Sequence, residues 1–227
     1  MLFRTISWLA LSIFLITLSG TVEIAESKTS KTKSTQPTKK QAKIEGFRSA
    51  KFGMKEKDVF KAIARDFKIT KNKVNRKVNP LEKTTSLEVT IPKLLGVGGT
   101  AKIGYLLGYK SKKLMQINIV WGRGAEESGK KVIAQEIVNT ANFLRNHLLK
   151  KEYKKDGFAA NQRVNDETTI VFRGKDKKDR MAILLLTSAK VTKDMDTKKD
   201  GDLVTLKLSY MLLPNKPDIL TIKDDDF

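Results

Sequence analysis

Cysteine is absent from this chain of 227 residues, and histidine occurs once, as His147. Without cysteine there is no disulfide, no thiolate nucleophile, no sulfur-bound metal and no lipid-bearing cysteine of a lipoprotein. A single histidine also leaves little scope for acid–base or metal chemistry near neutral pH. No nucleophile–base pair or metal constellation is visible elsewhere. We therefore expect no catalytic, cofactor-binding or metal-binding residues, no cofactor, and a function other than catalysis.

Acidic residues are scarce relative to basic ones. The chain has 45 Lys and Arg against 25 Asp and Glu, which gives a formal net charge of +20. Seven of the basic residues precede Glu45, so most of the positive charge lies in the body of the chain. Hydrophobic residues make up 40%, which is enough for one sizeable core. This balance predicts a folded basic protein whose partners are negatively charged.

Long hydrophobic runs are absent except near the N-terminus. A mostly apolar run covers Trp8–Leu18, preceded by Arg4 and followed by the small residues Ser19 and Gly20. That order is typical of a secretory signal peptide, and the run is short for a bilayer-spanning helix, which needs about 20 residues. We therefore expect residues 1–20 to be a signal peptide and the body to be periplasmic or otherwise extracytoplasmic.

Two alternatives stay open at this segment. Leu18 is a poor residue for the outer position of a signal-peptidase site, so residues 6–22 could instead remain as an N-terminal membrane anchor. The second alternative is an anchor with the body on the cytoplasmic side. The lysines that follow the apolar run favour it, because positive charge tends to stay on the cytoplasmic side of a membrane. In that case an anchored basic protein on the cytoplasmic side would bind nucleic acid, although no helix-turn-helix, zinc or RNP-like motif supports this.

Residues 21–44 are predicted to be a lysine-rich disordered linker, because they are polar and nearly free of large apolar side chains. Such a linker is either a solvated spacer or a basic strip that contacts anionic lipids, glycan polymers or an acidic protein. Its lysines are candidate contacts for an anionic partner: Lys28, Lys31, Lys33, Lys39, Lys40 and Lys43. The tip of a later hairpin adds three more: Lys110, Lys112 and Lys113.

Residues 45–217 show the periodicities of a folded domain, and residues 218–227 are expected to be an acidic tail. Apolar residues at helical spacing predict two helices, over 55–67 and from 127 to about 150. Alternation with a period of two predicts strands over 47–52, 87–91, 103–109, 115–121, 168–173, 180–191 and 203–213.

The order of these elements predicts an α+β fold built from two similar units, about 45–123 and 124–217. Each unit is a helix laid across an antiparallel meander. The two units are expected to share one antiparallel sheet of about six to eight strands. Both main helices would pack on one face of this sheet, and the other face would be turned toward water.

The stretch Gly53–Ile63, GMKEKDVFKAI, resembles the opening of the BamE-like outer-membrane assembly lipoproteins. The shared features are Gly53-Met54, a valine six residues after the glycine and an aliphatic residue four positions later. Doubling of that unit gives the β-lactamase-inhibitor-protein-like fold, and the expected order of two units looks like it. Lys55 stands where the family usually has threonine, and the lipid-bearing cysteine is absent. The resemblance implies an envelope protein that binds other proteins and does no chemistry.

Three further patterns have simpler explanations. Residues 96–101, GVGGTA, fit a dinucleotide-binding pattern in their letters, but a strand rather than a helix is expected after them, so we predict a turn. The aspartates over 194–202 lack the acid that a calcium loop has at its twelfth position, so we predict a hairpin turn. His147 is expected at the surface or half-buried at a helix end. Four aromatic residues are expected to serve packing rather than base stacking: Trp121, Tyr105, Tyr109 and Phe172.

These patterns together predict an exported, non-enzymatic envelope protein that binds another macromolecule through its basic surface. Long-range attraction would bring an envelope protein, or an anionic envelope polymer or lipid, to the lysines. Docking on the exposed sheet face or edge would follow. Membrane association through residues 6–22 and the oligomeric state stay open.

Overall fold

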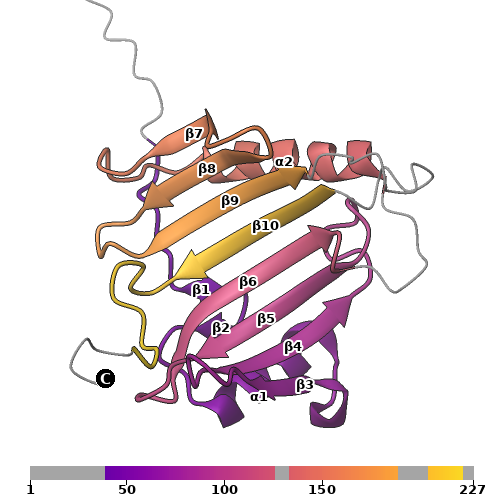
Figure 1. The fold of residues 1–227 in the computed structure, drawn as a ribbon, viewed down its shortest axis with the longest axis vertical. Helices are drawn as coiled ribbons and strands as arrows, with labels where there is room; N and C mark the ends of the chain where they lie inside the picture. The colour runs from indigo at the N-terminus through magenta and orange to yellow at the C-terminus, as the bar shows by residue number, and fades with distance from the viewer. Residues whose placement is uncertain (1–38, 126–132, 189–203, 222–227) are drawn as a thin grey trace, which may run out of the picture. The chain divides into compact units, whose positions relative to one another are not determined.

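The computed structural model describes residues 39–125, 133–188 and 204–221, in which one antiparallel sheet carries two helices (Figure 1). Its eight strands lie in the order β3-β4-β5-β6-β10-β9-β8-β7, and β1 and β2 form a separate hairpin. This arrangement confirms the expected α+β class, with about six to eight antiparallel strands and two main helices.

The first half of the fold runs from the small hairpin to β6. The hairpin consists of β1 (Gly46–Phe47) and β2 (Ala50–Lys51), and α1 (Glu56–Phe67) follows it. Helix α1 buries Val59, Ala62 and Ile63, which lie on one face because they are three and four residues apart. A 3₁₀ turn, η1 (Lys71–Lys73), then leads into four strands: β3 (Asn75–Val78), β4 (Thr85–Ile91), β5 (Ala101–Leu107) and β6 (Leu114–Gly122).

The second half repeats this order with a longer helix. Helix α2 (Ala134–Leu148) buries five residues along one side: Ile137, Thr140, Ala141, Leu144 and Leu148. Four strands follow it and form a second meander: β7 (Ala159–Arg163), β8 (Thr168–Lys175), β9 (Met181–Ser188) and β10 (Val204–Met211).

The two meanders meet through their last strands, β6 and β10, which pair antiparallel from Gly122 opposite Thr205 to Gln116 opposite Met211. Gly122 lies at the end of this junction with a φ of +80°. A Cβ atom at Gly122 would come within 2.2 Å of the carbonyl oxygen of Val204. The close approach of the two halves at this point therefore requires glycine.

The core lies between the sheet and its helices. Alternate residues of the central strands point to this side and are buried, as the pleat of a strand requires. One continuous hydrophobic cluster includes residues from both halves. The largest fully buried side chains include Trp121, Tyr105 and Phe172, which confirms that these three aromatic residues serve packing.

The expected linker extended to residue 44, but its last residues belong to the folded body. Gln41 forms a parallel bridge with Glu152, and the backbone N–H of Ala42 donates to the carbonyl of Glu152 at 2.8 Å. Ala42 and Ile44 are buried. Ala42 and Ile44 alternate with Gln41 and Lys43, so this extended segment turns its two apolar side chains into the body and Lys43 toward solvent.

A buried carboxylate fixes the end of this segment. Asp176 lies between β8 and β9, is 1% exposed, and accepts the backbone N–H of Ile44 at 2.9 Å on Oδ2. Nε of Arg180 donates to the same oxygen at 2.8 Å, while the backbone N–H groups of Lys178 and Arg180 donate to Oδ1. Burial alone would raise the pKa of Asp176, but these hydrogen bonds outweigh burial and lower the pKa below its ordinary value.

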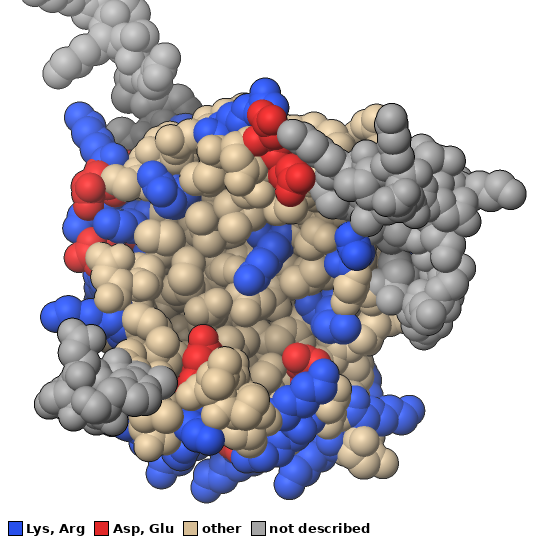
Figure 2. All heavy atoms as spheres, viewed as in Figure 1, with Lys and Arg blue, Asp and Glu red and all other residues tan. Residues whose placement is uncertain are grey.

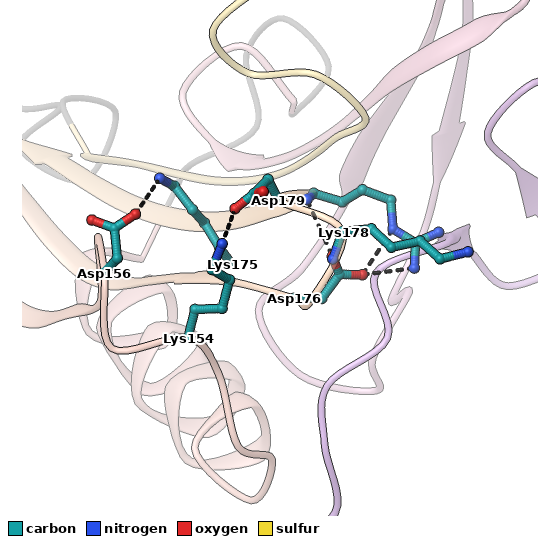
Figure 3. A network of polar contacts seen from close by, with 7 residues as sticks. Lys154, Asp156, Lys175, Asp176, Lys178 and Asp179 are labelled. Carbon is teal, nitrogen blue, oxygen red and sulfur yellow. Dashed lines mark hydrogen bonds and ion pairs between the residues drawn. The ribbon is translucent and has the colours of Figure 1, made fainter.

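Figure 3 shows that Asp176 belongs to a wider set of polar contacts around the β8–β9 turn. Lys154 pairs with Asp179, and Lys175 pairs with Asp156 at 3.2 Å. The carboxylates of Asp156 and Asp179 are largely exposed, so these two ion pairs contribute little to stability compared with the buried Asp176 contacts.

The expected acidic tail also begins later than residue 218. The backbone N–H of Leu220 donates to the carbonyl of Glu82 at 2.9 Å, and Asp218 bonds to the β5–β6 turn. Residues 218–220 are therefore held by turns of the first half, through contacts between positions far apart in the chain.

Several elements differ from their sequence-based predictions. Both edge strands, β3 and β7, were missed. Residues 47–52, expected as one strand, form the tight β1–β2 hairpin, where Arg48 adopts a φ of +50°. Helix α2 is described from Ala134, and residues 127–132 of the longer predicted helix lie outside the described residues, as does the predicted turn over 194–202. The predicted turn over 96–101 is confirmed as a loop that leads into β5.

Candidate docking surface

The sheet has a second face, opposite the helices, which we call the open face. Figure 1 views the sheet from this side, with α1 and the β1–β2 hairpin behind the strands. In the same view, Figure 2 shows a hollowed surface that is mostly uncharged at its centre, with more Lys and Arg along the edge where α1 and β3 lie. Most of its side chains are half-buried, because side chains on neighbouring strands cover them only partly.

The four central strands, β5, β6, β9 and β10, contain no acidic residue and two basic ones, Lys102 and Lys207. Lys102 on β5 and Lys207 on β10 both stand opposite Val120 on β6. The three side chains therefore form a row across the open face, with a lysine on each side of the valine. Neither lysine forms an ion pair with any described residue, so no described carboxylate neutralises their charges.

The next row along the strands is polar and internally bonded. Oδ1 of Asn118 accepts Nε2 of Gln116 and Oγ of Ser209, both at 2.8 Å. These two bonds fix the Asn118 side chain with its amide nitrogen available for further donation. Opposite Asn118 on β5 is Gly104, which has no side chain and leaves a gap in this row. A Cβ atom at Gly104 would meet only Leu106 and Ser86, both at 3.7 Å.

The other end of the open face is apolar. Met211 on β10 stands opposite Met181 on β9 and opposite Gln116 on β6. Ile183 and Leu185 continue the apolar surface along β9, and each is half-buried. Along the four central strands the open face therefore changes from cationic at Lys102 and Lys207 to apolar at the two methionines. Beyond β9, the strand β8 places Arg173 opposite Ile183 and Lys175 opposite Met181.

Three of the expected contact lysines lie together at the tip of the β5–β6 hairpin. Lys110, Lys112 and Lys113 are all exposed, and Nζ of Lys112 lies 5.1 Å from the centre of the Tyr109 ring. The backbone N–H groups of Lys110 and Ser111 donate to the carboxylate of Asp218 at 2.9 and 2.8 Å. The tip is therefore a fixed turn that presents its lysines outward.

Asp218 is held as an anion by this turn. Burial alone would raise the pKa of Asp218, but hydrogen bonds from Ser111 and Lys110 and the charge of Lys110 lower it below its ordinary value. The hairpin tip already accommodates one carboxylate of the chain itself, which shows that its backbone donors can hold an anion.

The expected lysines of the N-terminal segment lie elsewhere. Lys39, Lys40 and Lys43 are exposed on the stretch that runs beside Glu152, and the backbone carbonyl of Lys40 accepts the N–H of Glu152 at 3.0 Å. The other three expected lysines lie outside the described residues: Lys28, Lys31 and Lys33. The described candidates thus form two groups, on the N-terminal segment and on the hairpin tip.

The one histidine and two partly buried tyrosines lie away from the open face. His147 is exposed near the end of α2, as predicted. Burial raises the pKa of Tyr153 and of Tyr210 to about 12, so neither phenol ionises near neutral pH. Among the residues that the structure describes, no three His, Asp or Glu side chains gather as metal ligands, and no helix is long and apolar enough to cross a membrane.

Lys102 and Lys207 are not singled out by the sequence. Each occupies a polar position in an otherwise apolar alternation, which indicates an open-face position, but neither strand by itself shows that the two lysines share a row. That proximity depends on both strands pairing with β6, and β10 reaches β6 only after the whole second half has intervened.

Comparisons with protein-family models, with curated proteins and with solved structures find no match for this chain. Its candidate site is therefore described from its own geometry. The central strands of the open face have a cationic end, a polar centre and an apolar end.

Proposed function

We propose that this chain is an exported, non-enzymatic protein of the cell envelope that binds another macromolecule through its basic surface. The observation that carries the proposal is the charge distribution. A net charge of +20 is combined with an open sheet face whose four central strands hold two lysines and no acid. A protein of this kind attracts acidic partners over long range and disfavours basic ones.

Binding would proceed in two stages. The exposed lysines of the N-terminal segment and of the hairpin tip raise the local concentration of a negatively charged partner. The partner then docks on the open face, where half-buried apolar side chains lose their remaining contact with water. The first stage sets the association rate, and the second sets how long the complex lasts.

Export is supported by the order of a basic residue, an apolar run and small residues over positions 1–20. The side of the membrane on which the body lies separates this proposal from the cytoplasmic, nucleic-acid-binding alternative. A reporter enzyme that is active only outside the cytoplasm, fused after Phe227, should be active. A reporter active only inside would overturn export.

The binding experiment uses three anionic probes on the purified chain: poly-L-glutamate, vesicles with anionic lipid and duplex DNA. We expect poly-L-glutamate to bind and its affinity to fall steeply between about 50 mM and about 500 mM salt, because salt screens the attraction. Poly-L-lysine of equal length is the control. Affinity that does not change with salt would contradict the first stage, and binding to DNA alone would favour the alternative.

A further inference from the structure

We propose that the partner is a protein and that it docks on the open face with a carboxylate between Lys102 and Lys207 and an apolar side chain against Met181 and Met211. This inference rests on the proposed function, because it names the class of partner and the place where it binds.

The cationic end supplies the electrostatic anchor. Lys102 and Lys207 flank Val120 in one row, and neither forms an ion pair with a described residue. Neighbouring strands lie about 4.8 Å apart, so the two lysine stems leave on opposite sides of Val120 and their ammonium groups can converge above it. A single carboxylate in that position would accept from both lysines while its neighbours cover the valine.

The polar centre adds a directional contact and a gap. The hydrogen bonds from Gln116 and Ser209 orient Asn118, so its amide nitrogen is pre-positioned to donate to a partner. Gly104, opposite Asn118, leaves space for a partner side chain to enter the row. A preformed gap beside an oriented donor favours one docking register over its neighbours.

The apolar end supplies the hydrophobic contribution. Met181 and Met211 face each other across β9 and β10, and Ile183 lies two residues along β9 from Met181. Unbranched methionines adapt to the shape of an apolar partner. Met211 lies four positions along β10 from Lys207, so the partner presents its carboxylate about 13 Å from its apolar side chain.

The same face is poorly suited to other anionic partners. A nucleic acid or an anionic glycan needs a line of closely spaced basic groups, and single-stranded nucleic acid also needs aromatic rings on which to stack. The open positions of the four central strands offer two lysines and no aromatic residue. On the flanking strand β8, Arg173 is hydrogen-bonded to the carbonyl of Gly157 and Lys175 is paired with Asp156. A mixture of few charges with half-buried apolar side chains is the composition of a protein–protein interface.

The proposal is tested by photo-crosslinking from defined positions of the full chain. A photoreactive amino acid replaces Val120 at the cationic end or Ile183 near the apolar end, and each chain is mixed with a solubilised envelope fraction of its source cell. The matched control carries the photoreactive group at Asn142, which is exposed on α2. We expect protease-sensitive adducts from positions 120 and 183 at roughly tenfold or greater yield over position 142.

The crosslinked peptides of the partner are then sequenced by mass spectrometry. We expect Asp or Glu next to the residue crosslinked from position 120, and an apolar residue at the site crosslinked from position 183. Adducts sensitive to nuclease or of lipid mass would overturn the proposal, as would partner peptides in which acidic and apolar residues occur in the opposite order.

Two sets of variants locate the surface. Gly104→Leu puts a side chain into the gap, where its Cβ would meet no atom of the chain closer than 3.7 Å, and Lys102→Glu with Lys207→Glu reverses the anchor. We expect each to lower the crosslink yield from position 183 about tenfold or more, while the circular-dichroism spectrum stays unchanged. Reversal of Lys110 and Lys112 at the hairpin tip is the charge-matched control and should lower the yield less than threefold.

The outcomes separate this inference from the proposed function. If the hairpin-tip variant abolishes capture while the open-face variants do not, basic-surface binding stands and docking on the open face is wrong. If no position yields an adduct and poly-L-glutamate also fails to bind, both are wrong.

Discussion

The two halves of the sheet follow the same order of elements but cover their inner faces differently. In the second half, α2 has 15 residues and lies against β6, β8, β9 and β10. In the first half, α1 has 12 residues and has β2 as its main neighbour, while β1 lies against β6 and β10. The second half is therefore covered by a single long helix, and the first half by a shorter helix and a hairpin.

The inner side chains of the sheet complement this difference. The first-half strands supply most of the largest fully buried side chains, including Tyr105 and Trp121, whereas the second half supplies Phe172, Leu184 and Leu206. The half with the shorter helix thus has the bulkier buried strand residues. The two halves show that alternation decides which side of a strand is buried, whereas the division of volume between helix and sheet is free to vary.

The largest expected effect comes from removing one core aromatic residue from each half. Trp121→Ala and Phe172→Ala should each lower the free energy of unfolding by about 3–5 kcal/mol. Because one hydrophobic cluster spans both halves, each variant should still unfold in a single transition, followed by circular dichroism in urea. Leu81→Ala, at a side chain that is 81% exposed, is the control and should change stability by less than about 0.5 kcal/mol. Two separate transitions would show that the halves are independent.

A slightly smaller effect is expected at the buried carboxylate of the second half. Asp176→Ala leaves the guanidinium of Arg180 and the N–H of Ile44 without their acceptor, which should cost about 3 kcal/mol. Chemical denaturation measures this cost. Asp179→Ala removes an exposed carboxylate from the same turn and should cost less than about 1 kcal/mol. An equal loss of unfolding free energy in the two variants would show that the buried Asp176 contributes no more than an exposed carboxylate.

The same residue makes stability depend on pH. The folded pKa of Asp176 is lower than its unfolded value. Its contribution is therefore fully present above the ordinary aspartate pKa of about 3.9 and is lost as the pH falls through the lower folded value. Thermal melts below about pH 4 should show a steeper loss for the natural chain than for Asp176→Asn. The variant lacks this titrating group, so parallel curves would contradict the assignment.

The smallest effect concerns the junction between the halves. Gly122 and Gly124 both have positive φ values, +80° and +87°, but only the Cβ of an alanine at 122 would meet a backbone atom. Gly124→Ala should cost about 1 kcal/mol from backbone strain alone, and Gly122→Ala about 2–3 kcal/mol because β6 and β10 must also separate. The difference between the two, measured by urea unfolding, reports how tightly the halves are joined. If both glycines tolerate alanine equally, the junction is looser than the structure shows.

Much of this fold follows from local patterns. The spacing of Val59 and Ile63 predicts α1, and period-two alternation predicts the central strands, because each of these elements buries one face. The edge strands β3 and β7 escaped prediction for the opposite reason. Nearly all of their side chains are exposed, so no alternation marks them.

Contacts between distant parts of the chain were also beyond local patterns. Residues 39–44 look like linker because three of the six are lysines, and their place in the body depends on Glu152 and Asp176. The candidate site shows the same limit. The hairpin-tip lysines are adjacent in sequence and were predicted together, whereas Lys102 and Lys207 become neighbours only when β5 and β10 both pair with β6.

The pairing of β6 with β10 has a consequence for biogenesis. As the polypeptide is made from its N-terminus, the first meander can be completed long before Val204–Met211 has left the ribosome. During that interval β6 presents a row of unpaired amide and carbonyl groups next to an apolar surface, which is a template for association with other chains. In the folded protein β10 pairs with β6 and covers these groups. Truncation before residue 204 should therefore yield aggregates rather than a soluble first half.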